Sequence, residues 1–376
     1  MTDTRINIAR IHVFTTALAC NYLVFIVGSL SIVFNNDILR PISLLVRLLL
    51  VGIFFLLTRN YLRLNLFDLV VSALALVSIL LAHDIFLLEA IVGLLIAKAL
   101  LKVDSHNAVV GKITYIMIIA LAIVMILAQL GFLHASNVLF RMYNNASYAN
   151  FGDYKYNWGF WQPNVMGYLV FGCVLAAFYA NKKFLLAASL FLMSIASYHG
   201  VSRTYLACSA IVLLYIVAEK ILGKRSRLIC EILYLSIIFA SILSVLFIIP
   251  SMVVEVFGER FFFETNLILS GRLYFARDIY QNVNFFDLLF GARYNLNRPD
   301  SFYLSLIYTQ GLIVFSVFMA FFVYIATLGL KRRDQHHLLI LAVAAIAGNF
   351  ENLANASSLL WLIVCISAYK IYYPML

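Results

Sequence analysis

The chain alternates long apolar stretches with short polar ones along almost all of its 376 residues. An α-helix needs about 20 apolar residues to cross the hydrocarbon core, and irregular backbone cannot face lipid. The apolar stretches therefore predict membrane-spanning helices. We expect about twelve of them, at roughly 12–34, 41–58, 66–82, 85–101, 113–133, 163–180, 184–199, 203–222, 228–250, 302–330, 338–350 and 358–373.

Two of the polar stretches are long enough to form substantial loops on one side of the membrane. They cover about 134–162 and about 251–301. The remaining connections are short and show no linker between domains. We therefore expect one integral membrane domain over 1–376, an all-α polytopic protein with two long outer loops.

Composition supports this class. The chain is 64% hydrophobic and 12% charged, whereas a soluble domain is about 25% charged. The first apolar run is too long for the core of a cleaved signal peptide, so we expect a retained signal anchor. All five cysteines lie in apolar runs, which favours buried packing over disulfides or a structural metal site. They are Cys20, Cys173, Cys208, Cys230 and Cys365.

Lysine and arginine in short loops favour the cytoplasmic side and set the orientation. With the N-terminus inside, the inner loops collect Arg5, Arg10, Arg59, Arg63, Lys102, Lys112, Lys182, Lys183, Lys224, Arg225, Arg227, Lys331, Arg332 and Arg333. Both termini are then cytoplasmic. The net charge of +10 is mostly a topology signal and an attraction to anionic membrane lipids, so no nucleic-acid partner is expected.

The basic residues left on the outer side are nearly all arginine. They are Arg40, Arg47 (within a span), Arg141, Lys155, Arg203, Arg260, Arg272, Arg277, Arg293 and Arg298. The guanidinium group binds phosphate through two donors and stays charged when partly desolvated, so this face favours a pyrophosphate or acidic sugar. The alternative is that each arginine only pairs with acids, carbonyls or lipid headgroups.

The first outer loop is rich in aromatic and amide side chains, the surface that sugar rings use. It contains Tyr143, Asn144, Asn145, Tyr148, Asn150, Tyr154, Tyr156, Asn157, Trp158, Trp161 and Gln162. The alternative is an interfacial aromatic belt.

Short motifs follow one another in the C-terminal part of the chain. They are Trp161-Gln162-Pro163-Asn164, Ser202-Arg203-Thr204, Ser270-Gly271-Arg272, and Asp300-Ser301-Phe302-Tyr303-Leu304 continuing to Gln310-Gly311-Leu312. In this order, and with these loop sizes, the chain resembles the Wzy-type bacterial O-antigen and capsular repeat-unit polymerases, which are related to O-antigen ligases. The resemblance runs from Trp161 to the C-terminal end, and topology alone supports the first 160 residues.

This resemblance implies a GT-C-like helical fold in the bacterial inner membrane, with the two long loops in the periplasm. It implies a glycosyltransferase that polymerises undecaprenyl-pyrophosphate-linked repeat units. A growing lipid-linked glycan is the donor and a new lipid-linked repeat unit is the acceptor. The leaving group is already activated, so no nucleotide or other cofactor is expected. A separate chain-length regulator protein is the expected partner.

The chemistry of this reaction assigns roles to particular residues. Charge that builds on the leaving pyrophosphate requires electrostatic stabilisation. Arginine supplies it without metal, and the sequence has no Asp-x-Asp or His-Glu-x-x-His pattern. The first candidates for a clamp, meaning the arginines that hold the pyrophosphate, are Arg203 and Arg272. The second-rank candidates are Arg277 and Arg293. The further substrate-binding candidates are Arg141, Trp161, Asn164 and Tyr303.

Asp300 is the candidate general base for the acceptor hydroxyl, because it lies where the resembling family has Asp or His. The sequence Pro299-Asp300-Ser301 before an apolar run is also typical of a helix N-cap, so capping is the competing interpretation.

Two other functions remain open. An O-antigen ligase would use the same fold and clamp to transfer glycan to lipid A core. A lipid-linked oligosaccharide flippase or another transporter would use charges inside the membrane, for which Arg47, Glu89 and Lys98 are the candidates.

Overall fold

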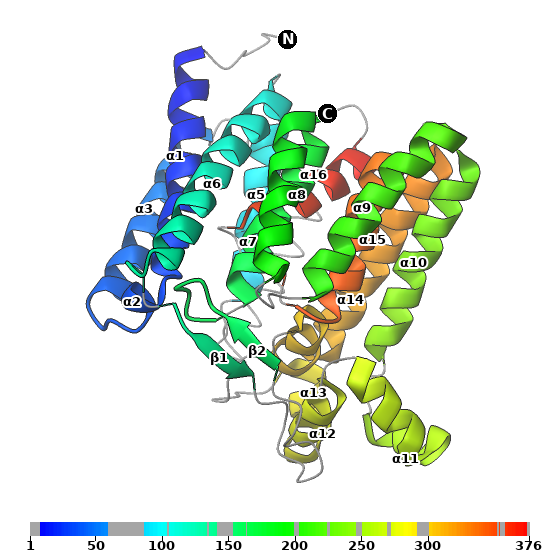
Figure 1. Ribbon diagram of the computed structural model, residues 1–376. Helices are drawn as coiled ribbons and strands as arrows, with labels where there is room; N and C mark the ends of the chain where they lie inside the picture. Colours follow the sequence, from blue (N-terminus) through cyan, green and yellow to red (C-terminus); the bar gives the residue numbers. More distant parts are fainter. Residues whose placement is uncertain are drawn as a thin grey trace.

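The computed structural model describes residues 8–58, 86–103, 105–133, 135–140, 153–162, 164–198, 203–223, 226–245, 250–268, 272–291, 301–351, 353 and 358–373. Within these ranges the chain is almost entirely helical (Figure 1). Helices satisfy their own backbone hydrogen bonds, which is the requirement for a chain this apolar.

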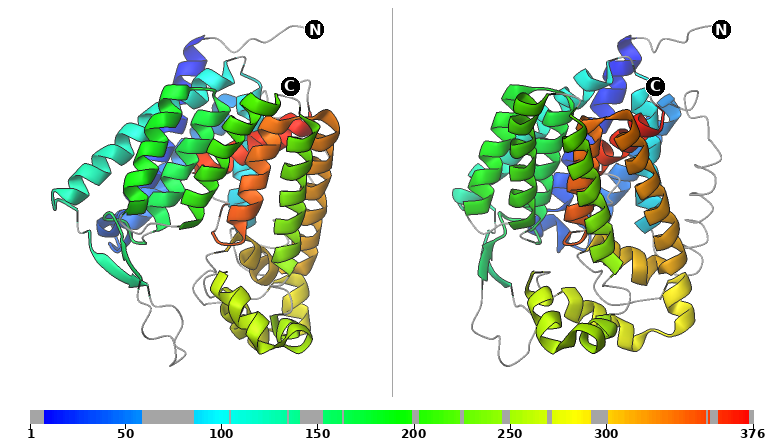
Figure 2. Two further views of the ribbon diagram at one scale, coloured as in Figure 1. Left: turned by 45° about the vertical axis from the view of Figure 1, so that its right-hand side comes forward. Right: turned by 90° about the vertical axis from the view of Figure 1, so that its right-hand side faces the viewer.

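The elements of the bundle follow the chain in order. They are α1 (Ile8–Gly28), α2 (Ser31–Phe34), α3 (Leu39–Thr58), α5 (Phe86–Leu101), α6 (His106–Gln129), α7 (Asn164–Tyr179), α8 (Lys183–Tyr198), α9 (Arg203–Leu222), α10 (Arg227–Val245), α14 (Phe302–Arg332), α15 (Gln335–Gly348) and α16 (Leu359–Tyr372). All except the one-turn α2 run between two ends of one bundle (Figures 1 and 2).

The two ends of the bundle differ. At one, α1 begins and α16 ends, and we call it the terminal end. The other carries β1 (Asn137–Phe140), β2 (Asp153–Tyr156), α11 (Pro250–Ile268), α12 (Arg272–Asn282) and α13 (Phe285–Phe290), and we call it the loop end. The structure thus places the beginning of α1 and the end of α16 on the same side of the bundle.

The bounds of the bundle helices agree with the hydrophobic pattern. Five helices among the described residues are long and apolar enough to cross a membrane: α3, α6, α9, α10 and α14. These features make the protein a helical membrane protein. The span predicted at about 66–82 lies outside the described residues, so the total of twelve stays a prediction.

The first predicted span, 12–34, is divided into α1 and α2. Leu30 forms a β-bridge with Phe160, and the Ser31 N–H donates to the Gly159 carbonyl at 2.7 Å. The backbone between the two helices is therefore bonded to the segment before α7 instead of continuing one helix.

The two long loops are more ordered than the sequence predicts. The segment 134–162 contains an antiparallel hairpin, in which Asn137 pairs with Tyr156 and Phe140 with Asp153. The segment 251–301 contains α12, α13 and almost all of α11. The described chain is therefore helical as predicted apart from this short hairpin, which the sequence did not predict, and the polar segment 251–301 contains helices.

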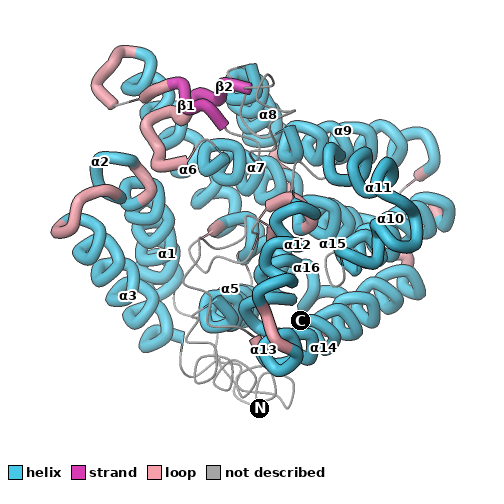
Figure 3. Tube along the Cα trace, turned by 90° about the horizontal axis from the view of Figure 1, so that it is seen from below, coloured by secondary structure: helices cyan, strands magenta, loops and turns pink. Residues whose placement is uncertain are grey.

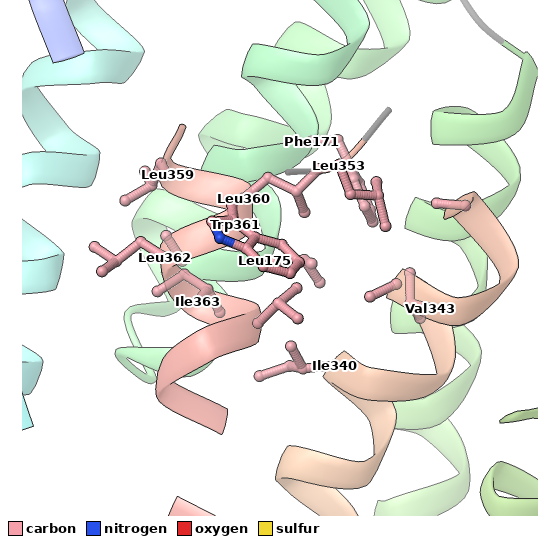
Figure 4. Packing of buried hydrophobic residues seen from close by; sticks show 14 of the residues in the cluster. Phe171, Leu175, Ile340, Val343, Leu353, Leu359, Leu360, Trp361, Leu362 and Ile363 are labelled. Atoms are coloured by element: carbon pink, nitrogen blue, oxygen red, sulfur yellow. The ribbon is translucent and has the colours of Figure 1, made fainter. Parts of the chain in front are cut away.

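The centre of the bundle is formed by α7, α15 and α16. Figure 4 shows Phe171 and Leu175 of α7 beside Leu360 and Ile363 of α16. A Cβ atom on Gly172 would lie 3.0 Å from the backbone nitrogen of Leu360. Small residues that allow two backbones to approach closely are typical of helix contacts in membranes.

The backbone of α14 is broken at Gly311, where φ is 87° and ψ is 160°. This conformation is essentially restricted to glycine. A Cβ atom at Gly311 would lie 2.3 Å from the Leu289 carbonyl oxygen of α13. Glycine at this position therefore permits both the break in α14 and the close approach of α13.

Candidate functional site

The loop end brings together the beginnings of several helices that are far apart in sequence. Figure 3 looks onto this end, where α11, α12 and α13 lie in front of the bundle helices. The segment after α15, residues 349–351 and 353, lies at the same end. Residues of α7, α12 and α14 contact this segment, as follows.

Glu351 is the buried acidic residue of this segment, with 6% of its surface exposed. Its N–H donates to the Ala347 carbonyl at 2.8 Å, and its own carbonyl accepts from Phe302 N–H at 3.1 Å. The Asn164 side-chain nitrogen lies 3.4 Å from Glu351 Oε2. A buried carboxylate requires such partners, so α7, α14 and α15 are joined at Glu351.

Arg272, the first residue of α12, contacts Phe350, the residue before Glu351. Its guanidinium Nη2 donates to the Phe350 carbonyl, and its Cζ lies 5.8 Å from the centre of the Phe350 ring. Glu351 follows Phe350 in the sequence. The cationic Arg272 is therefore bonded to the residue that directly precedes the anionic Glu351.

Two tyrosines extend the polar cluster into the bundle. Tyr168 donates from its hydroxyl to the Leu353 carbonyl at 3.2 Å. The Tyr205 ring stacks on Phe171 with centroids 5.4 Å apart, and its hydroxyl lies within electrostatic range of Glu351, Tyr168 and Arg272.

The beginning of α14 completes the cluster. Ser301 is the N-cap of α14, accepting from Leu304 N–H at 3.4 Å and donating to the Gly348 carbonyl at 3.0 Å. Tyr303 is buried, and its ring edge lies 3.1 Å from where a Cβ on Gly348 would be. The capping role considered for Pro299-Asp300-Ser301 therefore belongs to Ser301.

An apolar cavity of about 110 Å³ lies beside Tyr303, inside the bundle. Residues of α5, α14, α15 and α16 line the cavity, among them Phe318 and Trp361. Leu353, between α15 and α16, also lines it. Tyr303 and Leu353 therefore belong to both the cavity wall and the surroundings of the polar cluster.

The clamp candidates do not share one environment. Arg203 is the first residue of α9 and is exposed. Arg277 places its Cζ 5.9 Å from the centre of the Phe262 ring, so it faces α11. Arg272 contacts the segment containing Glu351, through its hydrogen bond to the Phe350 carbonyl.

In the aromatic segment before α7, the side chains of Asn157 and Trp158 are buried and contribute to the fold. Trp158 is fully buried, and Asn157 Oδ1 accepts from the N–H groups of Ser136 and Gly159 at 2.9 and 3.1 Å. Trp161 is half exposed and stacks on Phe34 of α2, with centroids 4.6 Å apart. The sugar-binding interpretation of Asn157 and Trp158 is therefore not supported by their placement.

Arg141, Arg293 and Asp300 lie outside the described residues. Their predicted roles in pyrophosphate binding and in base catalysis stay predictions.

The charged residues predicted inside the spans are placed by the structure. Arg47 of α3 lies within electrostatic range of Glu89 of α5 and Tyr168 of α7, and its Cζ is 4.9 Å from the centre of the Phe25 ring. Lys98 is buried within α5. Charged side chains therefore continue from the loop end toward the interior.

Glu351 is the site residue that sequence reasoning missed. It stands in Asn349-Phe350-Glu351-Asn352, a short polar group between two apolar runs with few acids nearby. Acidic residues contribute little to topology rules, so counting lysine and arginine passes over it. The signal that identifies it is an acid at a helix end beside hydrocarbon, where ionisable residues are costly and usually functional.

No family model matches the chain, and comparisons with curated proteins and with solved structures find no similar protein.

Proposed function

We propose that the protein is a polysaccharide polymerase that acts on undecaprenyl-pyrophosphate-linked repeat units at the periplasmic face of the bacterial inner membrane. One observation carries the proposal. Residues of three motifs that resemble the Wzy-type polymerases, Asn164, Arg272 and Tyr303, meet around the segment 348–351 at the loop end of a membrane-type bundle.

The chemistry assigned to this end is displacement at an anomeric carbon. Arg272, with Arg203 at the edge, stabilises charge on the leaving pyrophosphate through fixed guanidinium donors. The apolar cavity beside Tyr303 offers the hydrocarbon chain of a lipid substrate a surface that excludes water. The reaction needs no nucleotide because the pyrophosphate ester is already activated.

The finer architecture belongs to the same proposal: twelve spans, a GT-C-like fold and cytoplasmic termini. With this orientation the loop end is periplasmic. A chain-length regulator protein is the expected partner.

A second candidate is a lipid-linked oligosaccharide flippase or ion-coupled transporter. It is favoured by Arg47 and Glu89, which lie within electrostatic range of each other inside the bundle, since such charges often mark transport pathways. An O-antigen ligase would share the site but use lipid A core as the acceptor.

Gel analysis of surface glycan in a host deleted for this chain separates the three functions. The polymerase proposal predicts glycan with a single repeat unit, restored to a ladder by the wild-type chain. Free lipid A core would indicate a ligase. Neither of these two products, with precursor accumulated at the cytosolic face, would indicate a flippase and contradict the proposal.

A further inference from the structure

The environment of Glu351 suggests more than a structural charge. Both backbone groups of this residue are fixed by hydrogen bonds to Ala347 and Phe302. Its side chain is held by the amide nitrogen of Asn164. Because the residue is buried and oriented from two sides, its carboxylate is placed with little freedom.

Asn164 leaves an acceptor unused beside this carboxylate. The residue is 7% exposed, and its Oδ1 has no hydrogen-bond partner. Buried polar atoms are nearly always hydrogen-bonded, and an exception requires an explanation. A carboxylate and an amide oxygen together form a site for a hydrogen-bond donor. The hydroxyl of a sugar is the donor that the proposed substrates supply.

A cationic side chain, Arg272, is bonded close to Glu351 along the chain. Arg272 is bonded to the carbonyl of Phe350, which precedes Glu351. A ligand that places a phosphate at Arg272 and a hydroxyl at Glu351 would use both groups. A reaction in which a hydroxyl attacks as a pyrophosphate leaves needs both a proton acceptor and an anion-binding group.

We infer that Glu351, oriented by Asn164, is the general base that receives the proton of the acceptor hydroxyl. This assignment rests on the proposed function and is an alternative to Asp300, whose role stays a prediction. The hydroxyl proton passes to the Glu351 carboxylate as the oxygen forms its bond to the anomeric carbon. The bond from that carbon to the pyrophosphate oxygen breaks, and its electron pair leaves with the pyrophosphate at Arg272. Protonated Glu351 then returns the proton to water.

The test uses the full chain in lipid nanodiscs, with lipid-linked repeat units extracted from a host that lacks the chain. Glu351→Gln preserves the shape but cannot accept a proton. We expect transfer to slow by about 10²–10⁴-fold, while binding of undecaprenyl pyrophosphate alone stays within threefold of wild type. Glu255→Gln, an exposed acid of α11 at the same end, is the matched control and should transfer at the wild-type rate.

Glu351→His gives a readout that a purely structural role would not change. Histidine titrates near 6.5 and glutamate near 4.3 in model peptides. The activity that this variant retains should therefore fall on the acidic side at a higher pH than the activity of the wild type.

Three results would overturn the assignment. They are wild-type transfer by Glu351→Gln, loss of undecaprenyl pyrophosphate binding together with transfer in Glu351→Gln, and a transfer rate in Glu255→Gln that falls as far as in Glu351→Gln. If the wild type itself makes no polymer from these units, the proposed function fails and the base assignment fails with it.

Discussion

At the terminal end of the bundle the acid Asp334 is stabilised by the helix that it begins, whereas at the loop end Glu351 depends on residues far along the chain. Asp334 accepts from the ring Nδ1 of His337 at 2.8 Å and from its N–H at 3.3 Å. One side-chain partner of Glu351, Asn164, is 187 positions away.

The arginines differ in the same way. Arg227, at the terminal end, pairs with Glu231 one turn later at 2.7 Å and is mostly exposed. Arg272, at the loop end, bonds to a carbonyl 78 positions away. Local pairs stabilise helices, and long-range pairs require the tertiary structure to assemble them. Long-range contacts also occur at the terminal end, where Arg332 donates to the Ile371 carbonyl, and a local pair occurs at the loop end, where Arg260 pairs with Glu264. The difference therefore concerns these residues: the partners of Glu351 and Arg272 are assembled by the tertiary structure, whereas those of Asp334 and Arg227 lie on the same helix.

The largest expected effect concerns the two ends themselves, which should face opposite sides of the membrane. Asn284, at the N-cap of α13, and Lys331, near the end of α14, are both exposed. In a cysteine-free background, we expect a membrane-impermeant thiol reagent to label Asn284→Cys but not Lys331→Cys in cells with a permeabilised outer membrane. Labelling of position 331 alone would reverse the orientation, and equal labelling of both would refute the separation of the ends.

Replacement of arginine by lysine should separate the two kinds of pair. Lysine is a point charge without the two-donor geometry of arginine. We expect Arg272→Lys to slow polymer formation by about 10²–10³-fold, the usual cost of removing a transition-state donor. Arg227→Lys should have no measurable effect, since an exposed pair contributes about 0–1 kcal/mol. The intensity of the glycan ladder, measured at equal protein level, compares the two variants. A normal ladder with Arg272→Lys would show that this residue does not bind the pyrophosphate.

Two glycines test how tightly the loop end is packed. Gly311 and Gly258 both have the glycine-only backbone, with φ of 87° and 82°. A Cβ on Gly258 would meet nothing within 4 Å, but one on Gly311 would lie 2.3 Å from the Leu289 carbonyl.

Gly258→Ala should therefore lose only about 1–3 kcal/mol of stability through backbone strain. Gly311→Ala should lose more, because α13 must also move. Thermal unfolding, monitored by size-exclusion chromatography, measures the stability of both variants. Equal losses of stability would show that the contact between α13 and α14 is unimportant.

The smallest expected effect is at Asp334. Burial raises the pKa of this carboxyl, but the hydrogen bond and charge of His337 lower it more, so the net pKa lies below its ordinary value. The stabilisation is thus present above about pH 3.9 and lost as the pH falls through the depressed pKa.

Asp334→Ala should remove about 1 kcal/mol of cap stability at neutral pH and leave polymer length unchanged. The difference in unfolding temperature from wild type should shrink as the pH falls below the ordinary value. A shorter glycan ladder in this variant would show that the terminal end also takes part in the reaction.

The hydrophobic pattern predicted most of the described bundle because the membrane imposes it. The predicted span 203–222 has the bounds of α9, and 163–180 differs from α7 by one residue at each end. The pattern failed at α12, which begins at Arg272 and is too polar to be recognised as a membrane helix. Such a helix forms because α11 packs against it, through contacts such as Phe262 with Tyr274.

The site was partly predictable. Asn164, Arg272 and Tyr303 were found from short motifs, and the structure gathers them around the segment 348–351. Glu351 was not found, because its significance depends on α7 and α15 meeting at the loop end. Trp158 was misinterpreted, since sequence alone cannot distinguish a buried aromatic residue from one that faces a ligand.

The central proposal is that this protein joins lipid-linked repeat units, and reconstitution tests it most directly. Purified wild-type chain in lipid nanodiscs is mixed with extracted lipid-linked repeat units, without nucleotide sugars. Our account predicts a ladder of longer glycans, with undecaprenyl pyrophosphate released once for each added unit. Repeat units that remain single, with no release of undecaprenyl pyrophosphate, would contradict it.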